Sequence, residues 1–170
     1  MAMEARIMER ITGPTMLALL GKRPWTINDQ AVLLADIHKK LHEILAPDWI
    51  RDAPCGAGTQ LLHLDLHPSN IMIGYQGPVV IDWSNAARGH RDADVALTWV
   101  LLTAADIPSG RIKSMMLGSG RSLLIRRFLR EFNSEELKAQ LPAVIEWKLT
   151  GRHMSRTERD AMRRLAESTR

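Results

Sequence analysis

The stretch HLDLHPSN, residues 63–70, decides the fold together with the stretch VVIDW at residues 79–83. Two short apolar runs, 71–73 and 79–81, are rich in β-branched residues, and the turn-forming sequence GYQGP separates them. This composition and spacing predict a β-hairpin. Polar side chains therefore gather in the loop that enters the hairpin and directly after its second strand, where Asp82 stands.

The predicted hairpin brings Asn70 and Asp82 near each other at its open end. Buried carboxylates are costly unless a metal ion or hydrogen bonds stabilise them. An amide oxygen and a carboxylate are hard oxygen ligands that suit Mg²⁺. Asp65, a few residues upstream on the same loop, is placed to accept a proton from a substrate hydroxyl. The residues therefore indicate metal-assisted chemistry on a hydroxyl group.

The pattern His63-x-Asp65-x-x-x-x-Asn70, followed by Ile81-Asp82-Trp83, resembles the catalytic core of the aminoglycoside phosphotransferase and choline kinase-like family. That family shares the protein-kinase-like fold. The match is specific because two motifs occur in order with a hairpin between them. The resemblance implies an α+β, mainly helical fold: the C-terminal lobe of a protein-kinase-like phosphotransferase, in which a small β-hairpin carries the catalytic and metal-binding loop.

By this resemblance, Asp65 is the catalytic base, and Asn70 and Asp82 are the ligands of the Mg²⁺ that accompanies ATP. His63 is a structural member of the catalytic loop, and Asp94 braces that loop from a buried helix. Leu64 stands where the family usually has Gly.

The segment 8–15 resembles the hinge whose backbone meets adenine, and it makes Glu9 and Ile11 the expected nucleotide-binding residues. The resemblance covers almost the whole chain as hinge plus C-terminal lobe. It divides the chain into a hinge and linker remnant, 1–25, and a helical lobe, 26–170, with no N-terminal lobe in front. Apolar hinge residues such as Ile7, Ile11 and Met16 are then expected to be exposed, which favours self-association.

The resemblance implies an ATP-dependent small-molecule kinase that transfers the γ-phosphate to an alcohol group of its substrate, with ATP and Mg²⁺ as cofactors. Whether the chain is active alone stays open. One alternative is a non-catalytic kinase-lobe remnant or binding module. A second alternative is a metal-dependent hydrolase that uses His63, Asp65, His67 and Asp82 as a metal cluster. His67 and His90 are otherwise expected to be loop hydrogen-bonders.

The amino-acid composition excludes several classes of protein. Hydrophobic residues are 45% and charged residues 25% of the 170 residues, a globular balance that argues against disorder. The single cysteine, Cys55, excludes a disulfide framework within the chain. The longest apolar run, 95–105, is shorter than the about 20 residues that cross a bilayer, so we expect a cytoplasmic protein without membrane contact.

Charge is unevenly spread. Residues 1–110 carry 9 basic and 12 acidic side chains, whereas residues 111–170 carry 14 and 7. Such a basic segment can bind nucleic acid, but a set of solvated helix faces explains it better. The expected partners are therefore a nucleotide and a small hydroxyl substrate.

The rest of the chain is predicted to be helical. A first short helix starts near Met16, and a capping box of Thr26 and Asp29 opens a second helix, whose apolar stripe runs through Leu34 to Ile44 and Leu45. Further helices are expected over 94–105 and 111–132, then from a Ser134 cap with a kink or restart at Pro142, and from a Ser155–Glu158 capping box to about Ser168.

Overall fold

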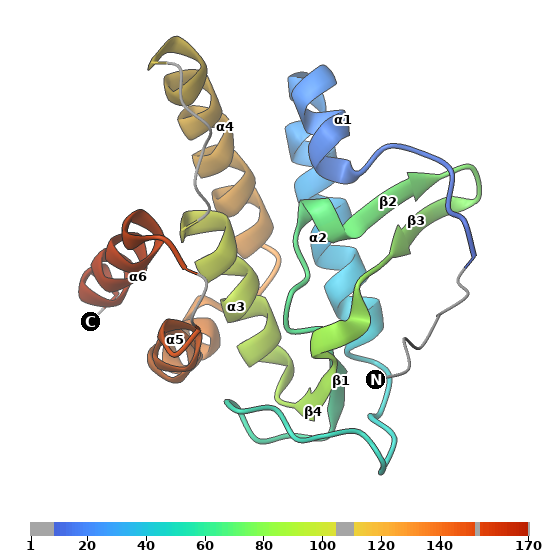
Figure 1. Ribbon diagram of the computed structural model, residues 1–170, viewed down its shortest axis with the longest axis vertical. Coiled ribbons are helices and arrows are strands. Elements are labelled where there is room, and N and C mark those ends of the chain that lie inside the picture. The colour runs from blue at the N-terminus through green and yellow to red at the C-terminus, as the bar shows by residue number, and fades with distance from the viewer. Residues whose placement is uncertain (1–8, 105–110, 152–153, 170) are drawn as a thin grey trace, which may run out of the picture.

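The computed structural model describes residues 9–104, 111–151 and 154–169, with the side chains of 111–117 left aside. The described part is α+β and mainly helical, which confirms the predicted class (Figure 1). In chain order, the helices are α1 (Met16–Lys22), α2 (Ile27–Leu41), α3 (Arg91–Ala104), α4 (Arg111–Leu129), α5 (Ser134–Leu149) and α6 (Arg156–Ser168). The strands are β1 (Gln60–Leu62), β2 (Ile71–Gly74), β3 (Gly77–Val80) and β4 (Ala87–Gly89). Short 3₁₀ turns stand at Pro24–Thr26, Pro68–Asn70 and Trp83–Asn85.

The strands form two antiparallel pairs. β2 and β3 make the predicted hairpin, in register from Ile71 opposite Val80 to Gly74 opposite Gly77. β1 pairs with β4, which was not predicted because its three residues, Ala-Arg-Gly, carry no strand pattern. Beyond the hairpin ladder, the amide of Ile81 donates to the carbonyl of Asn70 at 3.0 Å. That hydrogen bond continues the pairing of the two segments beyond the open end of the hairpin.

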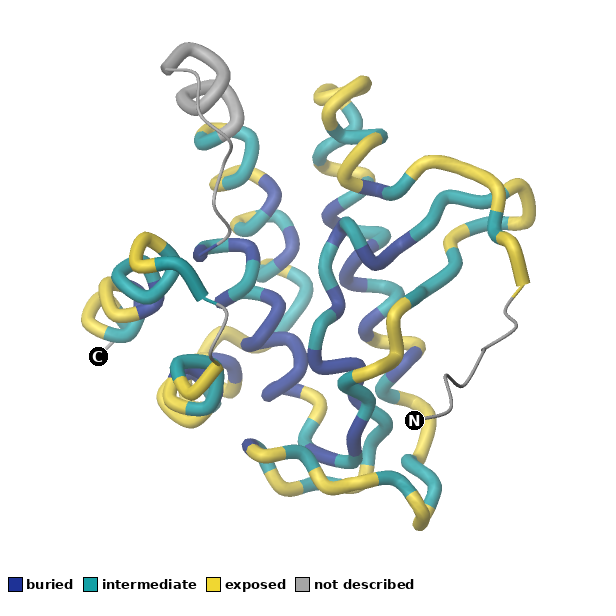
Figure 2. Tube along the Cα trace, viewed as in Figure 1, coloured by how far each residue is buried: buried dark blue, intermediate teal, exposed yellow. Residues whose placement is uncertain are grey.

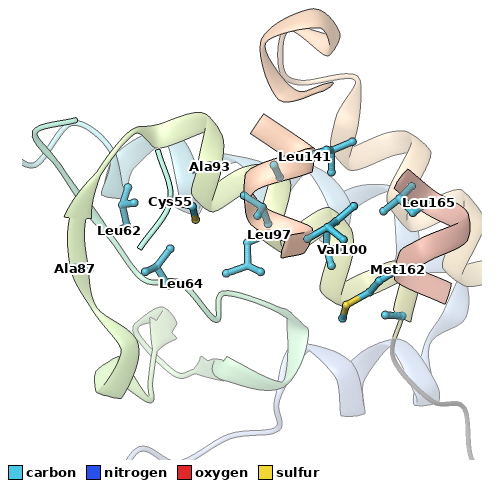
Figure 3. Close-up of a cluster of buried hydrophobic side chains, with 14 residues drawn as sticks. Cys55, Leu62, Leu64, Ala87, Ala93, Leu97, Val100, Leu141, Met162 and Leu165 are labelled. Atoms are coloured by element: carbon cyan, nitrogen blue, oxygen red, sulfur yellow. The ribbon is translucent and has the colours of Figure 1, made fainter. Parts of the chain in front are cut away.

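Helix α3 lies at the centre of the core. It is buried along most of its length, as predicted for this apolar segment (Figure 2). One side of α3 packs with β1, α5 and α6 in a cluster that includes Leu62, Leu64, Leu97 and Leu141 (Figure 3). Its other side packs with α1, α2 and α4 in a second cluster. A displacement of α3 would therefore disturb both clusters.

Helix α2 begins directly after Thr26, as predicted, but without the predicted capping box, and it ends earlier than predicted. The Thr26 hydroxyl donates to the carbonyl of Arg23 at 2.8 Å, so it does not cap the helix. The helix ends at Leu41, and Ile44 and Leu45 lie outside it with 50% and 70% exposure. The cause is pairing of the backbone with the first strand: the amide of Leu61 donates to the carbonyl of Ile44 at 2.9 Å.

The later helices follow local signals more closely. Ser155 and Glu158 form the predicted capping box, and α6 ends at Ser168 as expected. In α5, Asn133 caps the helix instead of Ser134, with its side chain accepting from the amide of Glu135 at 3.0 Å. The helix continues through Pro142 and does not restart there.

The exposure predicted for the first apolar residues is wrong for Met16, which is fully buried against the second cluster. Ile11 is half-buried, and Ile7 lies outside the described residues. No helix in the described ranges is both long and apolar enough to span a bilayer.

Candidate functional site

The loop of residues 63–70 leads from β1 into β2, and we call it the 63–70 loop. Asn70, at its end, is 9% exposed and turns its amide group back across the loop. Its Nδ2 donates to the carbonyl of Asp65 at 2.9 Å and to the Asp65 carboxylate Oδ2 at 3.2 Å. The amide nitrogen therefore faces Asp65, with His67 Nε2 at 3.5 Å, and the amide oxygen accepts no hydrogen bond from the described residues.

Asp82 follows Ile81, whose amide donates to the carbonyl of Asn70, so Asp82 stands at the same end of the hairpin as Asn70. Its backbone is left-handed, with φ 61° and ψ 62°. This conformation costs an L-residue about 1–2 kcal/mol, and such strain is concentrated at functional sites. The exposed Asp82 carboxylate accepts from the Ser84 hydroxyl at 2.7 Å. The structure thus brings Asn70 and Asp82 to one end of the hairpin.

His63 connects the start of the loop with the end of β3. The side chain is fully buried, and its Nε2 donates to the carbonyl of Ile81 at 3.0 Å. Its ring lies 4.8 Å from the ring of Trp83, measured between centroids. These contacts tie the loop that carries Asp65 to the strand end that carries Asp82.

Asp94, near the start of α3, is fully buried beneath the same loop. Its Oδ1 accepts from the amide of Leu64 at 2.8 Å, and its Oδ2 accepts from the amide of His63 at 3.1 Å. The ring of His42 lies 3.0 Å from the same Oδ2 through its Nε2. Burial raises the pKa of Asp94, but the hydrogen bonds from His42 and from the His63 amide outweigh it, so the pKa lies below its usual range. The Asp94 side chain that accepts the two hydrogen bonds from the loop backbone is therefore an ionised carboxylate.

The loop conformation above Asp94 is unusual because Leu64 has φ 57°. Glycine adopts this left-handed region without steric cost, and Leu64 stands where the resembling family usually has glycine. Its side chain is fully buried in the cluster that contains Leu97. Leu64 therefore combines a strained left-handed backbone with a fully buried side chain.

Two residues beside this site were missed from the sequence: His38 of α2 and His42, the C-cap of that helix. His38 is fully buried, with Nε2 3.1 Å from the Thr98 hydroxyl and Nδ1 3.9 Å from Asp94 Oδ2. Burial lowers the pKa of His38 to about 3, so the ring is neutral and forms no ion pair with Asp94. The available signal was the spacing, since histidines four residues apart share one helix face, here the apolar one.

The segment proposed as a hinge runs beside β2. The carbonyl of Pro14 accepts from the amide of Ile73 at 2.8 Å, and Thr15 forms an antiparallel bridge with Met72. Gly13 has φ 148°, and a Cβ there would lie 2.1 Å from the carbonyl oxygen of Ile73. Of the two expected nucleotide-binding residues, Ile11 is half-buried at this edge and Glu9 is exposed.

His67 and His90 accept hydrogen bonds within their loops, as expected. His67 Nδ1 accepts from the amide of Ser69 at 3.3 Å, and His90 Nδ1 accepts from the amide of Asp92 at 3.3 Å. The hydrolase alternative needs His63, Asp65, His67 and Asp82 around one ion. Among the described residues, a group of three ligands close enough for one ion is formed instead by His38, His42 and Asp94. The structure therefore does not favour the hydrolase.

The 63–70 loop and the end of the hairpin thus bring Asp65, Asn70 and Asp82 to one region of a mainly helical structure. The chain matches the phosphotransferase enzyme family over residues 2–113, and it belongs to that family. This confirms the family predicted from the sequence and makes the chain a phosphotransferase at the family level. The matched range contains all the predicted site residues, whereas α5 and α6 lie beyond it. A comparison with curated protein sequences gave no match.

Proposed function

We propose that this site transfers the γ-phosphate of ATP to an alcohol group of a small molecule, with Asp65 as the base. The observation that carries the proposal is the orientation of Asn70: its amide nitrogen donates to Asp65, which leaves the amide oxygen for a ligand at the hairpin end that leads to Asp82. In this proposal the segment 9–25 serves as the hinge to the nucleotide. The remaining helices form the acceptor side of the site.

The donor set at the hairpin end fits Mg²⁺, because the amide oxygen of Asn70 and the carboxylate of Asp82 are hard oxygen ligands. A bound Mg²⁺ supplies neutralisation of the charge on the nucleotide phosphates. The left-handed backbone of Asp82 and its bond from Ser84 set the direction of that carboxylate before any ligand arrives. Such preorganisation avoids the cost of reorienting the group during the reaction.

Asp65 has one carboxylate oxygen, Oδ2, fixed by the Asn70 amide. The other oxygen, Oδ1, lies 3.8 Å from His67 Nε2 and is available to a substrate hydroxyl. In the proposed step, the acceptor oxygen bonds to the γ-phosphorus, the bond to the ADP oxygen breaks, and the hydroxyl proton passes to Asp65. Positioning of this base and charge neutralisation supply most of the catalysis in phosphoryl transfer.

Nucleotide binding tests the proposal without requiring a known acceptor. Calorimetry with ATP in the presence and absence of Mg²⁺ should show Mg²⁺-dependent binding that Asp82→Ala abolishes and Asn70→Ala weakens. The matched control is Asp48→Ala, which removes an exposed carboxylate from another loop. If Asp82→Ala binds Mg²⁺–ATP like the parent protein, Asp82 is not a ligand and the proposal is wrong.

Turnover tests the role of Asp65. With an acceptor found from a panel of small hydroxyl compounds, Asp65→Asn should lower turnover by about 10²-fold or more and leave nucleotide affinity nearly unchanged. Retained turnover in this variant would contradict the assignment of Asp65 as the base. Mg²⁺-dependent ATP binding with no turnover on any acceptor would favour the non-catalytic binding module.

A further inference from the structure

Three titratable side chains meet under the 63–70 loop, outside the proposed phosphoryl-transfer site. His38 lies on α2, His42 stands four residues later at the C-cap of that helix, and Asp94 faces both from α3. Asp94 Oδ2 lies 3.9 Å from His38 Nδ1 and 3.0 Å from His42 Nε2. All three ligand atoms lie within 4.8 Å of one another.

His38 leaves one ring nitrogen without a partner. The Thr98 hydroxyl donates to the carbonyl of Leu66 at 2.7 Å, so toward His38 it can only accept, and the proton of the neutral ring is on Nε2. The lone pair of Nδ1 is therefore fully buried, forms no hydrogen bond, and faces a carboxylate oxygen. Unsatisfied buried acceptors are rare in folded proteins, and two acceptors that face each other attract a cation.

The arrangement has the features that metal-binding histidines share. Such a histidine usually donates its second ring N–H to a fixed acceptor, as His38 does to Thr98. Zinc bonds of about 2.0–2.2 Å in tetrahedral geometry place ligand atoms about 3.3–3.6 Å apart. Asp94 Oδ2 lies 3.0 Å from His42 Nε2 and 3.9 Å from His38 Nδ1, so ion binding requires only small shifts of these side chains. Two imidazole nitrogens with one carboxylate favour Zn²⁺ and Co²⁺ over Mg²⁺.

The cluster also has an access route. His42 lines a cavity of about 480 Å³ between α2, the start of α3 and the α4–α5 connection. The same lining carries four acidic side chains and two basic ones, Lys39 and Arg91, so its charge is negative in balance and favours cations. A water molecule from this cavity can complete the tetrahedral coordination.

We propose that His38 Nδ1, His42 Nε2 and Asp94 Oδ2 bind one divalent ion of the Zn²⁺ type. On binding, the proton of His42 moves from Nε2 to Nδ1, which leaves its ring neutral. Asp94 keeps its bonds to the amides of His63 and Leu64, because each carboxylate oxygen has two lone pairs. The ion would cross-link α2 to α3 and fix the carboxylate that holds the 63–70 loop, so its role is structural.

The direct test is the titration of protein freed of metal by chelation, using Zn²⁺ alone in calorimetry and Co²⁺ alone in visible absorption. We expect one ion per chain and the intense absorption of tetrahedral Co²⁺. Zn²⁺ should also raise the unfolding temperature, because a ligand of the folded state stabilises it. His42→Gln should weaken binding by on the order of 100-fold and abolish the thermal shift.

Matched variants separate this site from others. His90→Gln removes a histidine whose side chain is 41% exposed outside the cluster, and it should bind Zn²⁺ like the parent protein. Asp82→Ala should keep the Co²⁺ absorption, which distinguishes failure of this proposal from failure of the phosphotransferase site. If His42→Gln does not fold, Thr98→Val keeps all three ligands and should still weaken binding about 10-fold. Absence of tetrahedral Co²⁺ absorption, or unchanged affinity in the folded His42 or Thr98 variant, would overturn the proposal.

Discussion

Leu64 allows the cost of its left-handed backbone to be separated from the benefit of its packing. The side chain is fully buried, so Leu64→Ala should lower the free energy of unfolding by about 2–5 kcal/mol through lost packing. Alanine keeps the cost of φ 57°, which is about 1–2 kcal/mol for an L-residue. Glycine removes that cost but adds about 0.5–1 kcal/mol of unfolded-chain entropy.

Replacing alanine by glycine also loses the burial of the Cβ methyl, about 0.8 kcal/mol, so the two Leu64 variants should have nearly equal stability. What distinguishes Leu64 from an ordinary buried position is the about 1–2 kcal/mol of backbone cost that glycine removes. Leu62, equally buried in β1, provides the control, because its extended backbone gives glycine no advantage. Leu62→Gly should therefore be less stable than Leu62→Ala. Urea denaturation with a common slope measures all four values. The loss of stability from alanine to glycine should be smaller at Leu64 than at Leu62 by about 1–2 kcal/mol, and equal losses at the two positions would refute the reasoning.

Three further outcomes are expected. Asp94→Asn should lower the free energy of unfolding by about 3–5 kcal/mol in urea denaturation, because one oxygen cannot replace the two that receive buried donors. Gly13→Ala should detach the segment beside β2 and speed its proteolysis, since the added Cβ would lie 2.1 Å from the Ile73 oxygen, whereas Gly21→Ala meets no atom within 4 Å and should be tolerated. Burial raises the pKa of Cys55 above its ordinary 9.0, so alkylation by iodoacetamide at that pH should be slow until urea unfolds the chain. Because the unfolded thiol loses its proton first, the same shift should lower stability as the pH rises above 9.0.

The sequence predicted the parts of the fold that local chemistry determines. The hairpin followed from two β-branched runs and a glycine-rich turn, and the start of α6 followed from the Ser155–Glu158 pair. The candidate site could be predicted for the same reason, since Asp65 and Asn70 stand on one short loop. Hairpin pairing then places Asp82 beside Asn70.

The features that were missed depend on contacts between distant segments. Ile44 and Leu45 continue the apolar period of α2, but pairing with the first strand takes their backbone out of the helix. β4 exists because β1 offers it a partner, and its own residues give no indication of a strand. In the sequence, His38 directly precedes Lys39 and Lys40 and therefore resembles a surface residue. It belongs to the core because α3, which carries Thr98, packs against it.

The two hydrogen bonds by which the 63–70 loop donates to Asp94 affect how fast its amides exchange with solvent. Amides of functional loops commonly exchange through small local openings. The amides of His63 and Leu64 instead donate to the fully buried Asp94 carboxylate, in the first turn of the helix that packs in both core clusters. Solvent reaches them when α3 separates from the loop, so their exchange should report the opening of the core. Loosening of this loop and loss of global stability would then be one event, visible at the same two amides.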